Sequence, residues 1–173
     1  MNQIVDSITK YKYINFKNRN TSIFNIDESL NSKEIFLDDD LTFKEDELAE
    51  IPVFNDIAAG EPIEINENLE KNFYLPKGWL ERGKDTFILH VKGDSMIDKQ
   101  ICDGDLVVVK RQQTAYNNDI VAASVDGEAT LKILNTNGKV PMLMPANDKY
   151  MPIMITGKEV SILGVALGVI KQE

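Results

Sequence analysis

A serine and a lysine, Ser95 and Lys132, are the residues of this chain best suited by type and surroundings to covalent chemistry. Ser95 follows Gly93 and Asp94 in Val91-Lys92-Gly93-Asp94-Ser95-Met96, a sequence that predicts a bend after a strand. Lys132 interrupts the apolar run Ala129-Thr130-Leu131-Lys132-Ile133-Leu134. A serine hydroxyl needs a base beside it, and a lysine amine in dry surroundings can lose its proton and become that base. The pair therefore suggests nucleophilic catalysis.

A small-residue peptide lies upstream of both, Ile57-Ala58-Ala59-Gly60-Glu61-Pro62. Small side chains at Ala58 and Ala59 allow a strand to lie close to a serine, and Gly60 tolerates a tight backbone geometry. A nucleophile, a base and an acceptable peptide in one chain suggest a protease that cuts its own backbone once. Such a protein is a switch more than a metabolic enzyme.

Two alternatives weaken this interpretation when it rests on the residues alone. Histidine is the usual base for serine, and the chain has one, His90, which falls in the predicted strand just before Ser95. A histidine triad would then need an unusual local turn. A Gly-x-Ser sequence is also common, and a lysine in a strand usually extends its amine to solvent.

From Ile51 onward, short apolar runs alternate with turn residues. This pattern predicts strands at residues 87–91, 106–109, 120–125, 129–134, 140–144 and 162–170. Turns are predicted at Asp103-Gly104-Asp105, Asp126-Gly127 and Asn137-Gly138. We therefore expect a mainly β domain in which Lys132 lies on a strand.

The totals exclude several classes of protein. The net charge of −9 argues against a strongly basic nucleic-acid surface. The single cysteine, Cys102, excludes an internal disulfide and a multi-cysteine metal site, and we expect no metal or cofactor. The longest apolar segment, 160–170, is shorter than the roughly 20 residues needed to span a bilayer. No signal peptide is visible at the start, so we expect a soluble, cytoplasmic protein without a membrane association.

Composition shifts near residue 50, which predicts an acidic N-terminal arm, 1–50, and a domain, 51–173. The arm has six Lys and Arg against eleven Asp and Glu, a net charge of −5. Residues 10–24 fit either strands or a weak helix, and residues 38–47 fit a solvated segment or a short helix capped near Thr42. No helix-turn-helix is recognisable, and an acidic arm is poorly suited to phosphates.

Five motifs in order resemble the catalytic domain of LexA-type repressors and UmuD, the S24 family of Ser–Lys self-cleaving proteins. They are Ile51-Pro52-Val53 leading to Ala58-Ala59-Gly60-Glu61-Pro62, Val91-Lys92-Gly93-Asp94-Ser95-Met96, Asp103-Gly104-Asp105-Leu106, Ala129-Thr130-Leu131-Lys132 and Leu163-Gly164-Val165-Ala166-Leu167-Gly168-Val169-Ile170. The spacings from Ala59 to Ser95 and from Ser95 to Lys132 also agree with the family. The resemblance covers about 120 residues.

The resemblance implies a LexA-like catalytic domain of strongly bent antiparallel sheets, preceded by a short arm of uncertain structure. It implies Ser95 as nucleophile, Lys132 as general base, and the backbone N–H groups of Asp94 and Ser95 as the oxyanion hole. The scissile bond is then Ala59–Gly60, within the segment 57–62. In the family this segment swings between an exposed pose and a docked pose that buries the lysine.

The resemblance also implies a regulator of the SOS response to DNA damage, in which a RecA filament on single-stranded DNA stimulates self-cleavage. The chain resembles a transcriptional repressor without a clear DNA-binding domain, so DNA is a partner only if the arm or a missing domain binds it. The alternatives are a UmuD-like accessory factor of a DNA polymerase, or a non-cleaving interaction module that keeps the fold. A signal peptidase shares the Ser–Lys chemistry, but the membrane anchor of that group is absent from the sequence. We expect a homodimer built in part through the strand at 160–170, which is apolar enough to need a cover.

Overall fold

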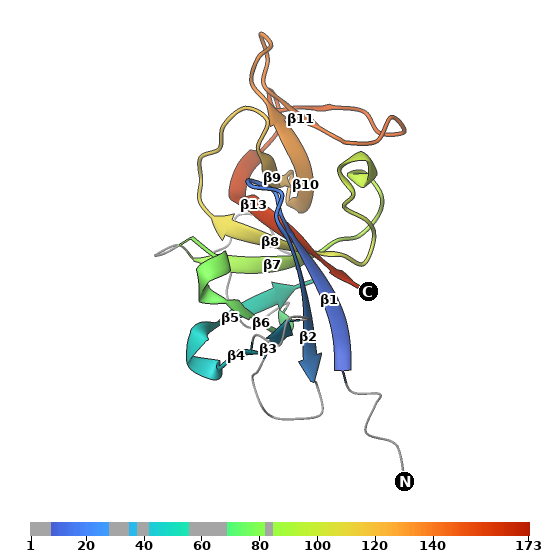
Figure 1. The fold of residues 1–173 in the computed structure, drawn as a ribbon. Coiled ribbons are helices and arrows are strands. Elements are labelled where there is room, and N and C mark those ends of the chain that lie inside the picture. Colours follow the sequence, from blue (N-terminus) through green and yellow to red (C-terminus); the bar gives the residue numbers. More distant parts are fainter. Residues whose placement is uncertain (1–7, 28–34, 38–41, 56–68, 82–84) are drawn as a thin grey trace.

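The structure is a computed structural model of the 173-residue chain, and it describes residues 8–27, 35–37, 42–55, 69–81 and 85–173 (Figure 1). The strands are β1 (Ile8–Asn15), β2 (Thr21–Asp27), β3 (Ile35–Leu37), β4 (Thr42–Phe43), β5 (Leu48–Phe54), β6 (Leu69–Pro76), β7 (Thr86–His90), β8 (Leu106–Arg111), β9 (Ile120–Val125), β10 (Glu128–Asn135), β11 (Met142–Met144), β12 (Ile153–Met154) and β13 (Val160–Gln172). Short 3-10 helices are η2 (Glu45–Glu47), η3 (Lys77–Trp79) and η4 (Ile97–Lys99). The mainly β prediction is confirmed.

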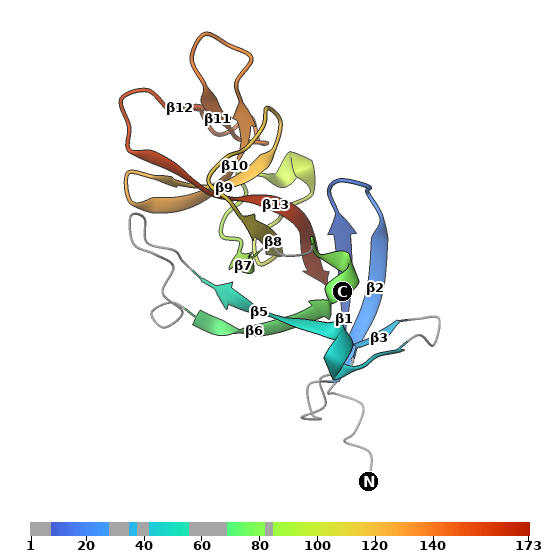
Figure 2. The same ribbon diagram turned by 90° about the vertical axis from the view of Figure 1, so that its left-hand side faces the viewer.

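The described strands belong to one sheet, whose longest path runs β12-β11-β10-β9-β13-β1-β2-β3-β4. Strands β5 to β8 branch from this path, since β8 pairs with β13, β7 with β8, and β5 with both β7 and β6. The β5–β7 pair is parallel, so the sheet is mixed and not purely antiparallel. Figure 2 shows β9 to β12 gathered at one end of the molecule and β5 and β6 at the other.

Strand β13 connects the two ends because it pairs with three different strands. Its first half pairs with β9, residues 164–170 pair with β8, and residues 168–172 pair with β1. Gly168 allows the close approach of β1, since a Cβ atom there would lie 2.5 Å from the Ile14 carbonyl oxygen. The sequence led us to expect that a second copy would pack on this apolar strand. For residues 164–172, the neighbours are instead β8 and β1 of the same chain.

The described part of the N-terminal arm forms strands, which decides between the two structures left open for residues 10–24. Strand β1 pairs antiparallel with both β2 and β13 (Figures 1 and 2). Its Tyr13 ring stacks on Trp79 at 5.5 Å, and its Tyr11 ring stacks on Phe24 and meets Phe73 edge-on. The arm hairpin is therefore packed into the same hydrophobic core as Ile51, Val53 and Ile88.

The other open segment of the arm, 38–47, contains β4 and the short helix η2 where the structure describes it. Lys44 precedes η2, and its backbone N–H donates to the Glu47 carboxylate at 3.0 Å. Strand β5 runs through residue 50 without interruption. The division of the chain at that residue stays a prediction.

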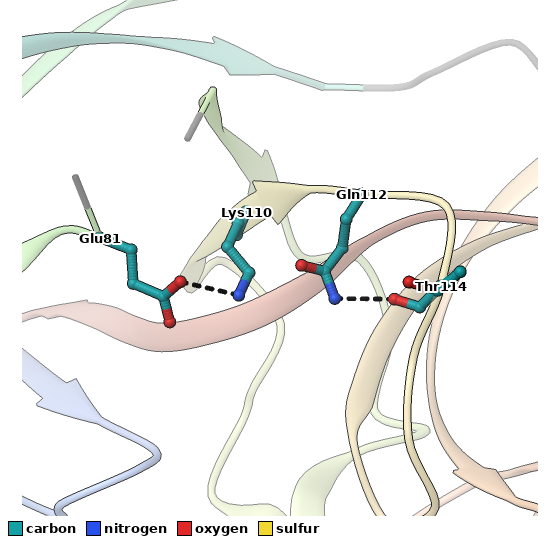
Figure 3. Close-up of polar contacts among 4 residues, drawn as sticks. All are labelled: Glu81, Lys110, Gln112 and Thr114. Atoms are coloured by element: carbon teal, nitrogen blue, oxygen red, sulfur yellow. Dashed lines mark hydrogen bonds and ion pairs between the residues drawn. The ribbon is translucent and has the colours of Figure 1, made fainter. Parts of the chain in front are cut away.

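Polar contacts hold the end of β8 and the turn that follows it (Figure 3). The Lys110 ammonium lies 2.9 Å from the Glu81 carboxylate, which ties β8 to the segment after η3. The Gln112 side-chain amide donates to the Thr114 carbonyl oxygen at 2.7 Å. After this turn the chain continues into the β9–β10 hairpin, which carries Lys132.

Candidate active site

Ser95 lies in the connection between β7 and β8, which is closed at its base by backbone hydrogen bonds. The Val91 N–H donates to the Asp105 carbonyl at 2.8 Å, and the Gly104 N–H donates to the Val91 carbonyl at 2.9 Å. Gly93 has a φ of +80°, a conformation that favours glycine, and its N–H donates to the Asp103 carboxylate at 2.6 Å. The predicted bend before the serine is therefore present.

The residues around Ser95 fix the turn against the core. Met96 is 2% exposed and Ile101 is fully buried, and both pack in a cluster with Phe87 and Val107 of the two flanking strands. Burial of two apolar side chains so close in sequence holds the turn in place by roughly 1.5–3 kcal/mol each. The partly exposed Ser95 is thereby held in a fixed position.

Lys132 is positioned by the β9–β10 hairpin. Asp126 and Gly127 have φ values of +48° and +94°, as a tight two-residue hairpin turn requires, and they set Lys132 opposite Val121. Alternate side chains of a strand share a face, so Thr130 lies on the same face as Lys132. The prediction that Lys132 lies on a strand is confirmed.

The Lys132 amine meets Ser95 directly. Its Nζ lies 3.1 Å from the Ser95 Oγ, 2.7 Å from the Thr130 Oγ1 and 3.1 Å from the Leu131 carbonyl oxygen. A neutral amine has two N–H donors and one lone pair. Thr130 and Leu131 can take the two donors, which leaves the lone pair free to accept the Ser95 proton. The three contacts therefore match what a lysine base needs.

Burial favours the neutral amine. The Lys132 side chain is 7% exposed, and its desolvation lowers the pKa of the amine from the ordinary 10.5. A base with a lowered pKa is neutral in a larger fraction of molecules at any pH below 10.5. The competing base, His90, has its Nδ1 3.2 Å from the Asn55 Oδ1, while the contact to the serine hydroxyl comes from Lys132.

A cavity of about 290 Å³ opens beside Ser95. Its walls come from the end of β5, the β7–β8 connection and the start of β10, and they include Asn55, His90, Lys92, Ser95, Glu128 and Leu131. The predicted cleavage segment, including Ile57, Ala58, Ala59, Gly60, Glu61 and Pro62, lies outside the described residues. The described chain ends before that segment at Asn55, which itself lines the cavity.

The predicted oxyanion hole lies in the same turn. Neither the Asp94 nor the Ser95 amide donates a hydrogen bond to another of the described residues, so both N–H groups are available there. The part of the chain that the structure describes holds no group of three or more His, Cys, Asp or Glu residues that could hold a metal ion. No helix in that part is long and apolar enough to cross a membrane.

Sequence reasoning missed the loop after β11, which holds the serine turn from the other side. The Ala146 N–H donates to the Ser95 carbonyl and the Asn147 side-chain amide donates to the Asp94 carbonyl, each at 2.8 Å. The Tyr150 hydroxyl donates to the Asp94 carboxylate, which raises the pKa of that tyrosine. Sequence reasoning also gave no role to Thr130. The available signal was the position of Thr130 two residues before Lys132 on a predicted strand, which puts both side chains on the same face.

Several known proteins are similar to this chain in sequence. The Peptidase S24-like family model matches residues 52–167. The LexA repressor of Thermotoga sp. (strain RQ2) is 47% identical over 122 residues, which are 70% of this chain and 62% of that protein. The LexA repressors of Alcanivorax borkumensis and Clostridium perfringens are 41% and 40% identical, over 70% and 75% of this chain. The chain spans about 60% of the length of these relatives.

Proposed function

The chain belongs to the S24-like peptidase family, and from that membership and its site we propose that it is a serine peptidase that cleaves itself. Ser95 is the nucleophile and Lys132 the general base. The observation that carries the proposal is the buried Lys132 amine, 3.1 Å from the Ser95 hydroxyl and held by two acceptors. An exposed lysine at this distance would be an ammonium and could not take the proton.

The first half of the reaction forms an acyl-enzyme. The neutral Lys132 amine takes the Ser95 proton as Oγ bonds to the carbonyl carbon of Ala59. The negative charge that develops on the carbonyl oxygen is stabilised by the N–H groups of Asp94 and Ser95. The Lys132 ammonium then gives its proton to the Gly60 nitrogen as the Ala59–Gly60 bond breaks. The new amino terminus leaves.

The second half releases the enzyme. Lys132 takes a proton from water, whose oxygen bonds to the ester carbon, and Lys132 then returns the proton to Ser95 as the ester bond breaks. Two features favour the chain's own peptide as substrate. Asn55 brings the chain to the cavity, and a cavity of about 290 Å³ suits the small residues Ala58, Ala59 and Gly60.

We further propose that this self-cleavage serves a regulatory role. The matched proteins are named LexA repressors, so the chain is proposed to act as a self-cleaving repressor-type regulator. The family resemblance of its motifs extends the proposal to the SOS response and to stimulation by a RecA filament on single-stranded DNA. The described residues include no helix-turn-helix, and the net charge is −9. A gel shift of the chain against DNA, before and after cleavage, separates this role from the polymerase-accessory alternative, for which no binding is expected.

Self-association as a homodimer is also part of the proposal. Strand β13 offers a second copy the edge opposite β9 at residues 160–163, because β8 and β1 take both edges further along. Light scattering across a range of concentrations tests it. A mass of one chain at all concentrations would contradict the dimer.

The decisive experiment is self-cleavage at alkaline pH and with an activated RecA filament. Fragments ending at Ala59 and beginning at Gly60 are expected by mass spectrometry. Ser95→Ala and Lys132→Ala are both expected to abolish them, because each removes one partner of the proton transfer. Cleavage that persists in either variant would show that the site is wrongly assigned. An uncut wild-type chain would favour the non-cleaving interaction module.

A further inference from the structure

The loop after β11 bonds to the two carbonyl groups on either side of the Ser95 Cα. Each carbonyl belongs to a peptide unit with an N–H at its opposite end, because the peptide bond is planar and trans. The Asp94 carbonyl shares its unit with the Ser95 N–H, which is one of the two proposed oxyanion donors. Whatever fixes the Asp94 carbonyl therefore fixes the direction of that N–H.

Asn147 makes this contact with its side chain. Its Nδ2 donates to the Asp94 carbonyl oxygen at 2.8 Å, in a partly buried setting. The other side-chain atom, Oδ1, accepts from the Lys149 N–H at 3.0 Å, which orients the amide so that its NH₂ group faces Asp94. Asn147 is thus held by its own loop with its donor directed at the serine turn.

Donation to a carbonyl also polarises the peptide unit. Hydrogen bonds in a chain strengthen one another, so a unit whose oxygen accepts from Asn147 has a more positive N–H at its other end. The Ile97 N–H also donates to the Asp94 oxygen, but at 3.3 Å, which makes it the weaker of the two contacts.

We propose that Asn147 is a positioning residue for self-cleavage, which orients and polarises the Asp94–Ser95 peptide unit so that the Ser95 N–H stabilises the oxyanion. Asn147 acts through the backbone and touches no reacting atom. This inference rests on the proposed function. It concerns stabilisation of the oxyanion, which is separate from the proton transfer between Ser95 and Lys132.

Two substitutions at Asn147 separate its donor from its place in the loop. Asn147→Asp keeps an oxygen for the Lys149 N–H but loses the donor to Asp94, and Asn147→Ala loses both without adding a charge. Asn117→Ala is the matched control, since it removes an asparagine side chain that accepts from a backbone N–H, that of Thr136, in the connection between β8 and β9.

The measurement is the first-order rate constant of self-cleavage against pH, taken well below the melting temperature of each variant. Loss of a whole oxyanion donor costs about 10²–10³-fold in rate, and Asn147 supports a donor that stays in place, so we expect a fall of about 10- to 100-fold. Both Asn147 variants should show it. Asn117→Ala should stay within about threefold of wild type.

The midpoint of the pH profile distinguishes positioning from a merely structural role. The midpoint reports the Lys132 amine, which Asn147 does not contact, so it is expected to stay at the wild-type pH while the plateau falls. General loosening of the site would admit water to Lys132 and move the midpoint toward 10.5. That shift, or a plateau within twofold of wild type, would overturn the inference.

A second readout keeps the inference testable if the wild-type chain fails to cut itself, which would count against the proposed function alone. A fluorophosphonate probe reacts with an activated serine, as Oγ bonds to phosphorus and fluoride leaves. Its phosphoryl oxygen takes the position of the oxyanion. Labelling of Ser95 is expected to be at least tenfold slower in both Asn147 variants than in Asn117→Ala, and equal rates would contradict the role.

Discussion

At the scale of single residues, Lys132 sets the pH dependence of the proposed reaction. As the proposed base, the Lys132 amine has to be neutral to accept a proton, and burial lowers its pKa from 10.5. We expect the self-cleavage rate constant to rise with pH and to level off below pH 10.5. Lys132→Arg is expected to show no cleavage across this range, because a guanidinium with a pKa above about 12 stays protonated. Rate constants from gel densitometry between pH 6 and 11 test this, and a rise that continues beyond 10.5 would contradict it.

The same burial predicts a cost in stability. The pKa of Lys132 is lower in the folded state than the unfolded value of 10.5, so the folded state disfavours the charged amine. The cost is complete below the folded pKa, shrinks as pH rises, and vanishes above 10.5. We expect Lys132→Met to raise the free energy of unfolding at pH 7 by about 1–2 kcal/mol, as substitutions that relieve a functional strain do.

Urea unfolding at pH 7 and at pH 10 measures this gain, and the gain should be smaller at pH 10. Ser95→Ala is the control, since its hydroxyl does not titrate in this range. A gain for Lys132→Met that is equal at both pH values would assign it to packing and not to the buried amine.

The sequence predicts the catalytic pair but not the residues that support it. Ser95 and Lys132 are 37 positions apart, and their pairing follows from the family's motifs, which the 3.1 Å contact agrees with. Asn147 lies 53 positions from Asp94, and its contact depends on how the loop after β11 returns over the serine turn. Nothing in the local pattern of an asparagine in a turn indicates such a partner.

At the scale of elements, the packing of β1 on β13 depends on a glycine. A Cβ at Gly168 would lie 2.5 Å from both the Ile14 carbonyl oxygen and the Tyr13 ring. Gly168→Ala therefore has to push β1 away, and we expect it to lower the free energy of unfolding by about 1–3 kcal/mol. Fluorescence of Trp79, which stacks on Tyr13, should change as well.

Gly78→Ala is the matched control, because nothing lies within 4 Å of a Cβ at that position. Its unfolding free energy should stay within about 0.5 kcal/mol of wild type. Urea titration followed by circular dichroism gives both values. Equal stability of the two variants would show that β1 can shift without cost.

The elements themselves were predicted unevenly. Strands β7 to β10 and β13 could be predicted from apolar runs between turns of Gly, Asp and Asn. Each of these strands either is joined to the next by a short turn or has a strong apolar pattern of its own. The pattern at residues 10–24 left strand and helix open, since the partner that decides it, β13, is more than 150 positions away. The parallel pairing of β5 with β7 had no local signal for the same reason.

At the scale of the whole molecule, the arm hairpin and the proposed catalytic pair are expected to respond to alkaline pH in opposite ways. Tyr13 is 2% exposed, and burial raises its pKa to about 12. The folded pKa exceeds the unfolded value of about 10, so the neutral phenol stabilises the fold fully below pH 10. This stabilisation is lost as pH rises through 12, up to about 2.7 kcal/mol for two pKa units at 1.36 kcal/mol each.

We therefore expect the proposed self-cleavage to have an upper pH limit that Lys132 alone does not set. The neutral fraction of Lys132 grows as pH rises, because burial lowers the pKa of its amine. Ionisation of Tyr13 above pH 10 weakens the packing of β1 against β13 and Trp79. We expect wild type to lose stability steeply between pH 10 and 12, and Tyr13→Phe, which cannot ionise, to lose less. Urea unfolding of both proteins at pH 8, 10 and 11 tests this. The free energy of unfolding of Tyr13→Phe should rise relative to that of wild type only above pH 10. Parallel loss in the two proteins would mean that the arm hairpin does not limit the fold at high pH.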